Sequence, residues 1–437
     1  MKLALPVYGL LWRLALPFAL LRLWWRGRAE PLYRQHWGER LGWFGRTSVA
    51  DAVAANGPLI WVHAVSLGET RAAAALIEAL RERIPHMRLL LTHMTATGRA
   101  AGAGLLQSGD VQVWLPYDLP GPMRRFLRRF QPRAAVLMET EVWPNLAEQC
   151  RRAGVPVLLA NARLSARSAS RWQRWPSLAR VAWGGLFAAA QTPEDAQRIQ
   201  ALGAAQVQSL GNLKFDMRPD PALLQRGAQW KSAAARPVLL LASTREQGGK
   251  SEEALLLAAL PAKLAQRALL VWVPRHPQRF DAVAQLLADR GYAVQRRSAT
   301  APTQNTAVWL GDSLGEMAAY YAMSDAAFIG GSLLPLGGQN LIEACACGCP
   351  VVLGPSQFNF ASAAQAALEA GAAVQATDAS EVWAAFARWL DDSAARQRAG
   401  QNAFAFAAAH QGSAQRQADW IVEIAGDALR QRPDAGQ

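Results

Sequence analysis

The chain has 437 residues, of which 51% are hydrophobic and 18% are charged. This much apolar material and this little charge exclude a disordered chain, and the length predicts two domains, each with a core of its own. Lys and Arg outnumber Asp and Glu by 46 to 33, a formal net charge of +13. Such an excess favours an anionic partner: nucleic acid, phospholipid headgroups or a phosphorylated substrate.

The chain opens with an almost wholly apolar segment. It runs from Leu3 to Trp25, is interrupted by Arg13 and Arg22, and is followed by further arginines. About 20 apolar residues suffice to cross a bilayer, and the small-residue cleavage site of a signal peptide is missing. We therefore expect a retained membrane anchor over residues 1–28, spanning once or lying in the interface with its tryptophans at headgroup depth. The arginines after it place the rest of the chain on the cytoplasmic side, and a buried helix with a snorkelling arginine is the alternative.

Short apolar runs then alternate with amphipathic patterns, which predicts the βαβ order of a doubly wound sheet. The predicted strands are Leu59–His63, Leu89–Thr92, Val111–Leu115, Ala134–Met138 and Val155–Ala160. The predicted helices between them are Thr70–Arg83, Pro122–Phe130 and Asn145–Ala153.

The alternation restarts after a polar stretch around Asp216–Pro237, which we take as a linker. The strands predicted beyond it are Val238–Ala242, Leu269–Val273, Ala307–Leu310, Ala327–Ile329 and Val351–Leu353. The expected organisation is thus two α/β domains, 29–216 and 217–437. The carboxyl ends of parallel strands open into a cleft where ligands bind, so we expect the ligand to bind between the two domains and the residues after each strand to carry the chemistry.

Carboxylates follow two strands of the first domain. Glu69 stands at the entrance of a helix, where it can accept a proton from a hydroxyl nucleophile or can simply stabilise the first helical turn. Glu139 and Glu141 lie two apart where a strand gives way to a helix, so only one of them should face the ligand. Lys214, beside the linker, is a candidate to stabilise a leaving phosphate, or a solvated surface lysine.

Four segments of the second domain offer groups that can hold a phosphate. Ser243–Glu246 and Val273–Pro277 follow strands with hydroxyl and guanidinium groups, and Ser313–Met317 opens a helix. The fourth segment, Gly330–Glu343, is a glycine-rich loop that leads into a helix, with Asn340 and Glu343 on adjacent turns of one face.

Several enzyme classes lose support from missing motifs. There is no Walker pattern, G-x-G-x-x-G or H-E-x-x-H, which disfavours P-loop ATPases, standard hydride transfer and zincin proteolysis. Cys345, Cys347 and Cys349 lack the spacing of a structural zinc site, so we interpret them as small packing residues, with metal binding as the alternative. What remains is transfer of a nucleotide-activated group to a membrane acceptor.

Nine collinear blocks make this interpretation specific. The chain resembles the Kdo (3-deoxy-D-manno-oct-2-ulosonic acid) transferases, membrane-anchored glycosyltransferases with the GT-B fold. The blocks are His63–Glu69, Thr92–Gly98, Leu115–Asp118, Met138–Leu146, Asn161–Ser168, Gly211–Asp216, Val273–Phe280, Gly311–Met317 and Gly330–Phe360.

The resemblance implies inverting transfer of Kdo from CMP-Kdo to the lipid A precursor, lipid IVA, at the cytoplasmic face of the inner membrane, without metal or cofactor. Glu69 corresponds to the family's proton acceptor, and Glu139 and Lys214 to its transition-state stabilisers. The segments that correspond to the CMP-binding ones are Pro274, Arg275, Leu314, Gly315, Glu316, Asn340, Leu341, Ile342 and Glu343. Gln339 departs from the histidine found in many members, which puts a secondary contact in doubt.

Two other functions stay open beside this one. A different GT-B enzyme, such as a UDP-sugar transferase or epimerase, would bind UDP rather than CMP. A non-catalytic membrane protein would bind anionic lipid or nucleic acid; the family itself implies phospholipid contact and no nucleic acid. Arg124, Arg125, Arg128 and Arg129 are candidates to meet an anionic acceptor or lipid headgroups, or form a solvated helix face. No motif predicts the oligomeric state, the number of Kdo residues added or the acyl chains tolerated.

Overall fold

The computed structural model describes residues 4–45, 57–216 and 218–430, which form two compact units. The first unit contains the described residues up to Asp216 and those from Gly412 to Arg430, and the second contains Arg218–Gln411. The C-terminal segment, which the sequence placed in the second domain, thus belongs to the first unit. Its helix α20 (Ser413–Arg430) explains this, because apolar residues such as Trp420 and Ile421 are buried in the first unit's core beside α4 (Leu67–Arg83).

The first unit is built on a parallel seven-stranded sheet with the order β3-β2-β1-β4-β5-β6-β7. Its strands are β1 (Leu59–His63), β2 (Arg88–His93), β3 (Val111–Trp114), β4 (Ala134–Met138), β5 (Val157–Ala162), β6 (Phe187–Ala190) and β7 (Gln206–Ser209). The five predicted strands are present with small shifts at their ends, and β6 and β7 were not predicted. Residues of the inner strands β1, β4 and β5 are fully buried, as expected for a sheet covered on both faces.

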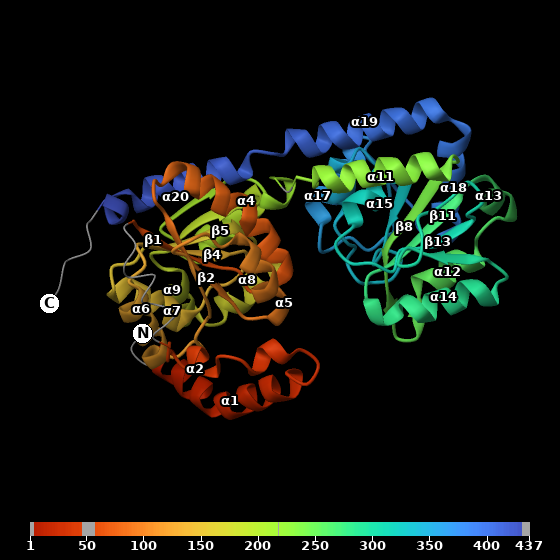
Figure 1. Cartoon of the computed structure of the whole chain (residues 1–437). Coiled ribbons are helices and arrows are strands. Elements are labelled where there is room, and N and C mark those ends of the chain that lie inside the picture. Colours follow the sequence, from red (N-terminus) through yellow and green to blue (C-terminus); the bar gives the residue numbers. More distant parts are fainter. Residues whose placement is uncertain (1–3, 46–56, 217, 431–437) are drawn as a thin grey trace. The chain divides into compact units, whose positions relative to one another are not determined.

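Helices cover both faces of this sheet. Beside α4 and α20 they are α5 (Ala96–Gly102), α6 (Pro120–Phe130), α7 (Pro144–Arg152), α8 (Ala166–Gln173), α9 (Pro176–Trp183) and α10 (Pro193–Ala201), with short turns η2 (Ala103–Leu105) and η3 (Leu213–Asp216). Helices α4 and α20 pack on one face of the sheet and α6, α7 and α9 on the other (Figure 1).

The second unit repeats the plan with the strand order β12-β13-β11-β8-β14-β15-β16, again parallel throughout. Its strands are β8 (Val238–Thr244), β11 (Leu269–Pro274), β12 (Val294–Arg296), β13 (Val308–Leu310), β14 (Ala326–Ile329), β15 (Val351–Leu353) and β16 (Ala373–Gln375); β9 (Glu246–Gln247) and β10 (Lys250–Ser251) form a separate hairpin.

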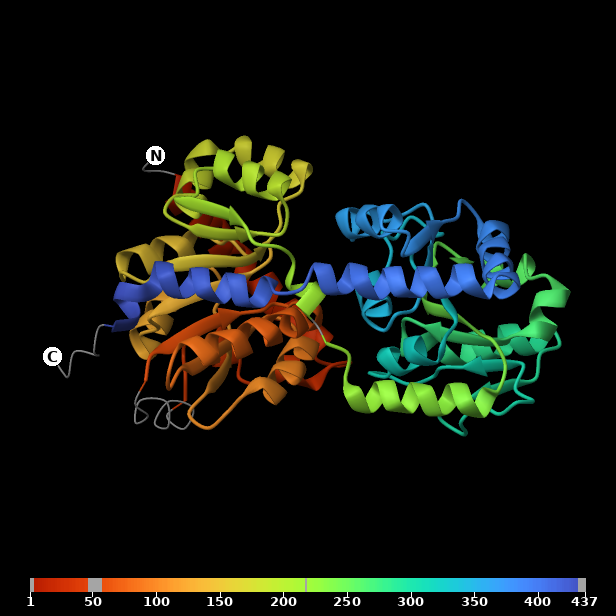
Figure 2. The ribbon, with the colours of Figure 1, turned by 90° about the horizontal axis from the view of Figure 1, so that it is seen from above.

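The helices of the second unit also lie on both faces of its sheet. They are α11 (Pro221–Ala234), α12 (Glu252–Ala258), α13 (Ala262–Arg267), η4 (Pro277–Arg279), α14 (Phe280–Asp289), α15 (Met317–Met323), α16 (Leu341–Ala346), α17 (Ala361–Glu369), α18 (Ala379–Asp391) and α19 (Ser393–Ala409). Seen from above, α11 and α19 run over the same face of the sheet (Figure 2); α12, α13, α14 and α18 cover the other.

The polar stretch predicted as a linker contains the helix α11. Asp220 caps it by accepting a hydrogen bond from the amide of Ala222 at 2.8 Å. The helix packs on α15, and the ring of Trp230 lies 5.0 Å from Trp309 and 5.4 Å from Tyr320. A prediction from polarity alone was wrong here, because one apolar stripe is enough to dock a surface helix.

The N-terminal helix α1 (Ala4–Arg26) carries two different faces. One packs on the first unit through Trp12, Leu16, Ala19, Leu20 and Leu23, next to η1 (Pro31–Arg34) and α2 (Trp37–Arg40). The opposite face exposes large apolar side chains at helical spacing: Val7, Leu10, Leu11, Leu14, Phe18, Leu21 and Trp25. The described part of the chain contains one helix, α1, that is long and apolar enough to cross a membrane. This statement rests on length and composition alone.

Candidate active site

The predicted acids and Lys214 gather at the carboxyl edge of the first sheet. Glu69 follows β1, Glu139 follows β4, and Lys214 lies in η3, which follows β7. Because all strands are parallel, these segments leave the sheet at the same edge. Residues far apart in the sequence therefore form one polar cluster in this unit.

Glu69 sits in the first turn of α4 and is held from both sides. The amide of Val65 donates to its Oε2 at 2.8 Å, and the hydroxyl of Ser66, the helix cap, donates to its Oε1 at 2.8 Å. Burial, with a smaller contribution from the negative charges of Glu141 and Glu139, raises the pKa of Glu69 to about 7, while these two hydrogen bonds act in the opposite direction. Its contacts place Glu69 at the start of the helix, and its role as a proton acceptor stays a prediction.

Glu139 and Lys214 form an ion pair at this edge. The Lys214 Nζ lies 3.3 Å from the Glu139 Oε1, and both side chains are largely buried. Glu139 has a φ of +55°, a left-handed conformation that costs a non-glycine residue about 1 kcal/mol or more. Strain of this kind is retained where the surroundings fix the residue, and it turns Glu139 out of the strand direction.

A buried asparagine fixes the segment that carries Lys214. Asn161, at the end of β5 and also at positive φ (+51°), accepts a hydrogen bond from the amide of Leu213 at 3.0 Å. The Asn212 side chain accepts from the Lys214 amide at 3.0 Å, and Asp216 accepts from the amides of Gly412 and Ala414. The backbone of η3 is therefore tied to the sheet and to the start of α20.

Glu141 adds a third carboxylate to the cluster. The indole N–H of Trp143 donates to its Oε2 at 2.8 Å, and burial raises its pKa. The alternation rule predicted that only one acid of the pair faces the site. Both acids lie beyond the end of β4, and the negative charge of each raises the pKa of Glu69.

His63, the first residue of the H-x-V-S-x-G-E block, is a core residue. Its side chain is fully buried and bonds through Nδ1 to Thr92, and burial lowers its pKa to about 3. A neutral histidine at this depth supports the packing of β1 against β2.

The predicted nucleotide-binding segments of the second unit also share one edge. Pro274 ends β11 and Arg275 follows it, Gly315 and Glu316 lie after β13, and the loop to Asn340 follows β14. The strands β13, β11, β8 and β14 are neighbours. The Arg275 Nε donates to the Gln339 side chain at 3.3 Å, which joins two of these loops. The residue that departs from the family pattern therefore makes a contact within the predicted site.

The other predicted residues of this edge differ in which of their atoms are accessible to a ligand. Leu314 is 68% exposed, and Gly315 has a φ of +82° that favours glycine. Glu316 pairs with Arg226 at 2.7 Å and Arg297 at 3.0 Å. Asn340 caps α16 by accepting from the Ile342 amide at 3.1 Å, while Glu343 lies half-buried in its first turn. The side chains of Leu341 and Ile342 are buried, so only backbone atoms of these two residues can meet a ligand.

Glu252 organises this edge and was missed in the sequence. Its fully buried carboxylate accepts hydrogen bonds from the amides of Arg245 (2.9 Å), Gly331 (2.6 Å) and Leu333 (2.9 Å). It thereby ties the loop after β8 to the glycine-rich loop after β14. The only signal was a pair of acids after Lys250-Ser251, which polar surface helices also show.

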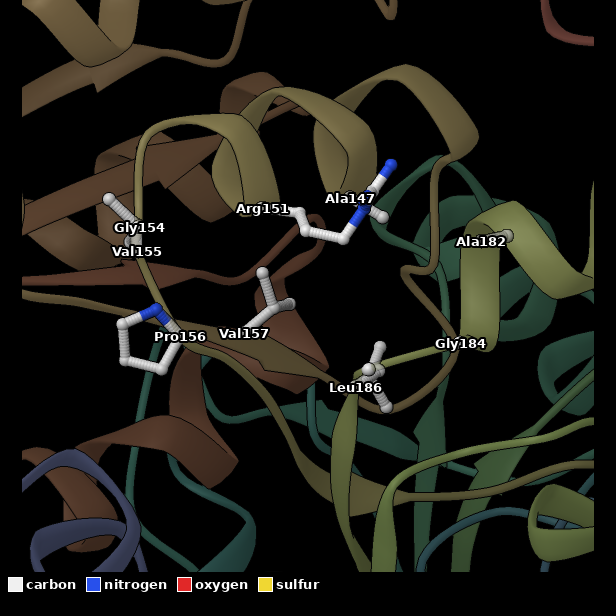
Figure 3. A pocket seen from close by; sticks show the side chains of 10 residues that line it. Ala147, Arg151, Gly154, Val155, Pro156, Val157, Ala182, Gly184 and Leu186 are labelled. Carbon is white, nitrogen blue, oxygen red and sulfur yellow. The ribbon is translucent and has the colours of Figure 1, made fainter.

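One pocket, of about 240 Å³, lies at the opposite, amino edge of the first sheet (Figure 3). It is lined by Ala147, Arg151, Gly154, Val155, Pro156, Val157, Ala182, Gly184, Gly185 and Leu186. It contains none of the predicted site residues, and its single charged group, Arg151, is paired with Glu148. We therefore do not assign the candidate site to it.

Within residues 4–45, 57–216 and 218–430, no group of three or more His, Cys, Asp or Glu side chains is arranged to hold a metal ion. Cys345 and Cys349 are buried, and burial raises the pKa of Cys345 and Cys347 to about 12. Thiols in this state pack as small apolar groups at the end of α16, as we interpreted them from the sequence.

Two family models match the chain. Residues 35–217 match the 3-deoxy-D-manno-octulosonic-acid transferase (kdotransferase) model, and residues 289–406 match glycosyl transferases group 1. A 3-deoxy-D-manno-octulosonic acid transferase of Bordetella pertussis is 47% identical over 88% of this chain and 91% of its own length. The Haemophilus influenzae protein of the same name is 37% identical over 76% of this chain and 77% of its own length.

Solved structures add a likeness in fold. The UDP-GlcNAc 2-epimerase of Neisseria meningitidis aligns with a TM-score of 0.54 and 14% identity, covering 84% of this chain and 98% of its own. With two Rossmann-like units, each on a parallel seven-stranded sheet, the predicted GT-B fold class is confirmed.

Proposed function

The chain belongs to the 3-deoxy-D-manno-octulosonic acid transferase family of glycosyltransferases, and we propose that it transfers Kdo from CMP-Kdo to lipid IVA in lipopolysaccharide biosynthesis. The observation that carries the catalytic part of this proposal is the acid cluster of the first unit. It supplies a carboxylate with a pKa of about 7 together with a buried Glu139–Lys214 pair.

Glu69 acts as the general base. As the acceptor hydroxyl oxygen bonds to the anomeric carbon of Kdo, its proton passes to Glu69, while the bond from that carbon to the CMP phosphate oxygen breaks and CMP leaves with the electron pair. A base whose pKa lies near the working pH is the most effective at this step, since it is ionised and still binds a proton firmly. Attack opposite the leaving group inverts the anomeric centre.

Lys214 and Glu139 stabilise the transition state electrostatically. Phosphate oxygens gain negative charge as CMP departs, and a lysine in a partly dry site stabilises such charge more than one in water does. Glu139 holds the ammonium in place, and the hydrogen bonds of Asn161 and Asn212 to the η3 backbone hold its segment.

The second unit holds the nucleotide part of the donor. Arg275 supplies a cation, and the loops at residues 314–316 and 340–343 supply backbone amides and side-chain hydrogen-bonding groups, in the arrangement that Glu252 fixes. This mechanism requires neither a metal ion nor an organic cofactor.

The helix α1 lies flat in the interface of the inner membrane. A helix that packs one face on a folded domain from Trp12 to Leu23 cannot also cross the bilayer, whereas its other face exposes an apolar stripe of the kind that inserts among lipids. Arg13 and Arg22 lie at the flanks of this stripe, where they reach phospholipid headgroups. The catalytic unit is then held at the cytoplasmic face, where nucleotide sugars are found.

Nucleotide binding tests the donor assignment. Calorimetric titration with CMP and with UDP compares the wild type, Arg275→Gln and the control Arg290→Gln, which removes an exposed arginine at the end of α14. We expect CMP to bind better than UDP, with about tenfold loss in Arg275→Gln and none in the control. Preference for UDP would favour a different GT-B enzyme, and binding of neither would leave the donor assignment without support.

A further inference from the structure

We propose that the helix α1 is a positioning element of the active site: through Trp12 and Trp143 it fixes Glu141 of the acid cluster. The inference rests on the proposed role of Glu69 as the base. It concerns the face of α1 that packs on the first unit, and not the exposed face that meets lipid.

Trp12 is the centre of this packed face. Its ring stacks on that of Trp143, with 6.3 Å between the ring centroids and 19° between the ring planes. The centroid of the Tyr117 ring lies 5.7 Å from that of Trp12. Its indole N–H donates to the hydroxyl of Tyr8, one turn earlier in α1, at 2.7 Å. Tyr117 lies in the loop after β3 and Trp143 in the loop after β4, so both rings stand at the carboxyl edge of the sheet.

A buried carboxylate adds a second link between α1 and the same loops. The Tyr8 hydroxyl hydrogen bonds to Asp118, which is fully buried. Asp118 in turn accepts from the amides of Asn145 at 3.1 Å and Leu146 at 2.7 Å, in the first turn of α7. Helix α1 therefore fixes both the ring of Trp143 and the start of α7, which follows Trp143 directly.

Trp143 passes this constraint to the acid cluster. Its N–H donates to Glu141 at 2.8 Å, and this contact fixes where the negative charge of Glu141 stands. The groups that face Glu69 are the Val65 amide and Ser66 hydroxyl from the α4 entrance and the carboxylates of Glu139 and Glu141 from the turn after β4. Lys214 from η3 neutralises Glu139 by pairing with it. The negative charge of Glu141, like that of Glu139, raises the pKa of Glu69.

The consequence is that α1 serves the reaction as well as the membrane. When the Trp12 ring is removed, Trp143 loses its stacking partner and can turn away from Glu141. The carboxylate then loses a donor that favours its ionised form, so it is more often neutral or displaced, and Glu69 becomes a weaker base. The working pKa of Glu69 moves down, towards the usual range of glutamate.

The test compares Trp12→Leu and Trp143→Phe with the control Phe18→Leu. The control also replaces an aromatic ring of α1 by leucine, but on the exposed face, where Phe18 is 76% exposed. All are assayed as full-length protein in detergent micelles with solubilised acceptor, so that membrane affinity does not limit the rate. The readout is the pH profile of kcat/KM, whose acid limb reports the base of the free enzyme.

We expect the acid limb of both tryptophan variants to move down by about half a pH unit or more, and kcat to fall about threefold to tenfold with the KM for CMP-Kdo unchanged. Trp12→Phe, which keeps an aromatic ring for stacking, should restore most of the profile, and Phe18→Leu should match the wild type. Glu141→Gln, which keeps an oxygen acceptor for Trp143, covers the case in which a tryptophan variant does not fold, and should move the limb in the same direction.

An acid limb that stays in place in Trp143→Phe and in Glu141→Gln, while Glu69→Gln is inactive, would overturn the positioning role and leave the base assignment standing. Full activity of Glu69→Gln would instead overturn the base assignment itself. The two failures are therefore distinguishable.

Discussion

Replacing Glu69 by glutamine should lower the activity about 10²- to 10⁴-fold and, at neutral to alkaline pH, make the protein more stable. The pKa of Glu69 rises from the ordinary 4.5 to about 7 because burial and two neighbouring carboxylates disfavour its charge. A difference of this size corresponds to about 3 kcal/mol of unfavourable free energy when the group is ionised. Glutamine carries no charge, so this unfavourable free energy is absent from the variant. Glutamine can accept only one of the two hydrogen bonds from Val65 and Ser66, and the lost hydrogen bond lowers the stability of the variant by about 1 kcal/mol.

The gain should depend on pH with a defined sign. Below pH 4.5 the wild-type carboxyl is protonated in both the folded and the unfolded state, so the variant has no advantage. As the pH rises through 7, the folded wild type must release a proton that it binds more tightly than the unfolded chain does, and its stability falls relative to the variant. Above pH 7 the variant should be more stable by about 2 kcal/mol, which raises Tm by several degrees in a unit of this size.

Thermal unfolding at pH 4.5 and pH 8 measures this difference. The matched control is Glu78→Gln, on an exposed position of the same helix, which should follow the wild type at both values. A Glu69→Gln variant less stable than the wild type at pH 8, or with the same Tm difference at both pH values, would refute the reasoning that its carboxylate is held ionised at a cost.

Three further outcomes follow from the contacts. Lys214→Met, which removes the cation paired with Glu139, should lower kcat about 10²-fold or more in a steady-state transfer assay while CMP binding stays within about twofold. Glu252→Gln removes the carboxylate that accepts hydrogen bonds from three loop amides. It should weaken CMP binding about tenfold in calorimetry, because the loops after β8 and β14 lose the side chain that joins them. Leu14→Glu, on the exposed face of α1, should release the protein from phospholipid vesicles in a sedimentation assay without lowering its activity on detergent-solubilised acceptor.

Where the sequence predicted the fold, buried parallel strands carried the signal. Runs such as Ala134–Met138 are apolar on both faces and short, a combination that surface helices do not share. Strand β6, with the sequence Phe-Ala-Ala-Ala, was missed because alanine favours helices and only its neighbours β5 and β7 make it a strand. The placement of α20 in the first unit depends on contacts with α4 that lie more than 300 residues apart, such as Arg83 with Asp419.

The candidate site was predicted where it rests on local pattern. Glu69 and Glu139 follow recognisable strands, and the family resemblance carried Lys214, whose approach to Glu139 no spacing predicts. Glu252 and Trp143 could not be predicted, because their roles depend on which loop amides and which carboxylate the fold brings beside them. The link from Trp12 to Glu141 is likewise invisible before the structure, since an apolar N-terminal segment is explained by lipid alone.

The central claim is tested most directly by transfer of labelled Kdo, generated as CMP-Kdo in the assay, to lipid IVA by the purified wild type, Glu69→Gln and Glu78→Gln. The account predicts product with the wild type and with Glu78→Gln, and a loss of about 10²- to 10⁴-fold in the folded Glu69→Gln. No transfer by a folded, CMP-binding wild type, or full transfer by Glu69→Gln, would contradict it.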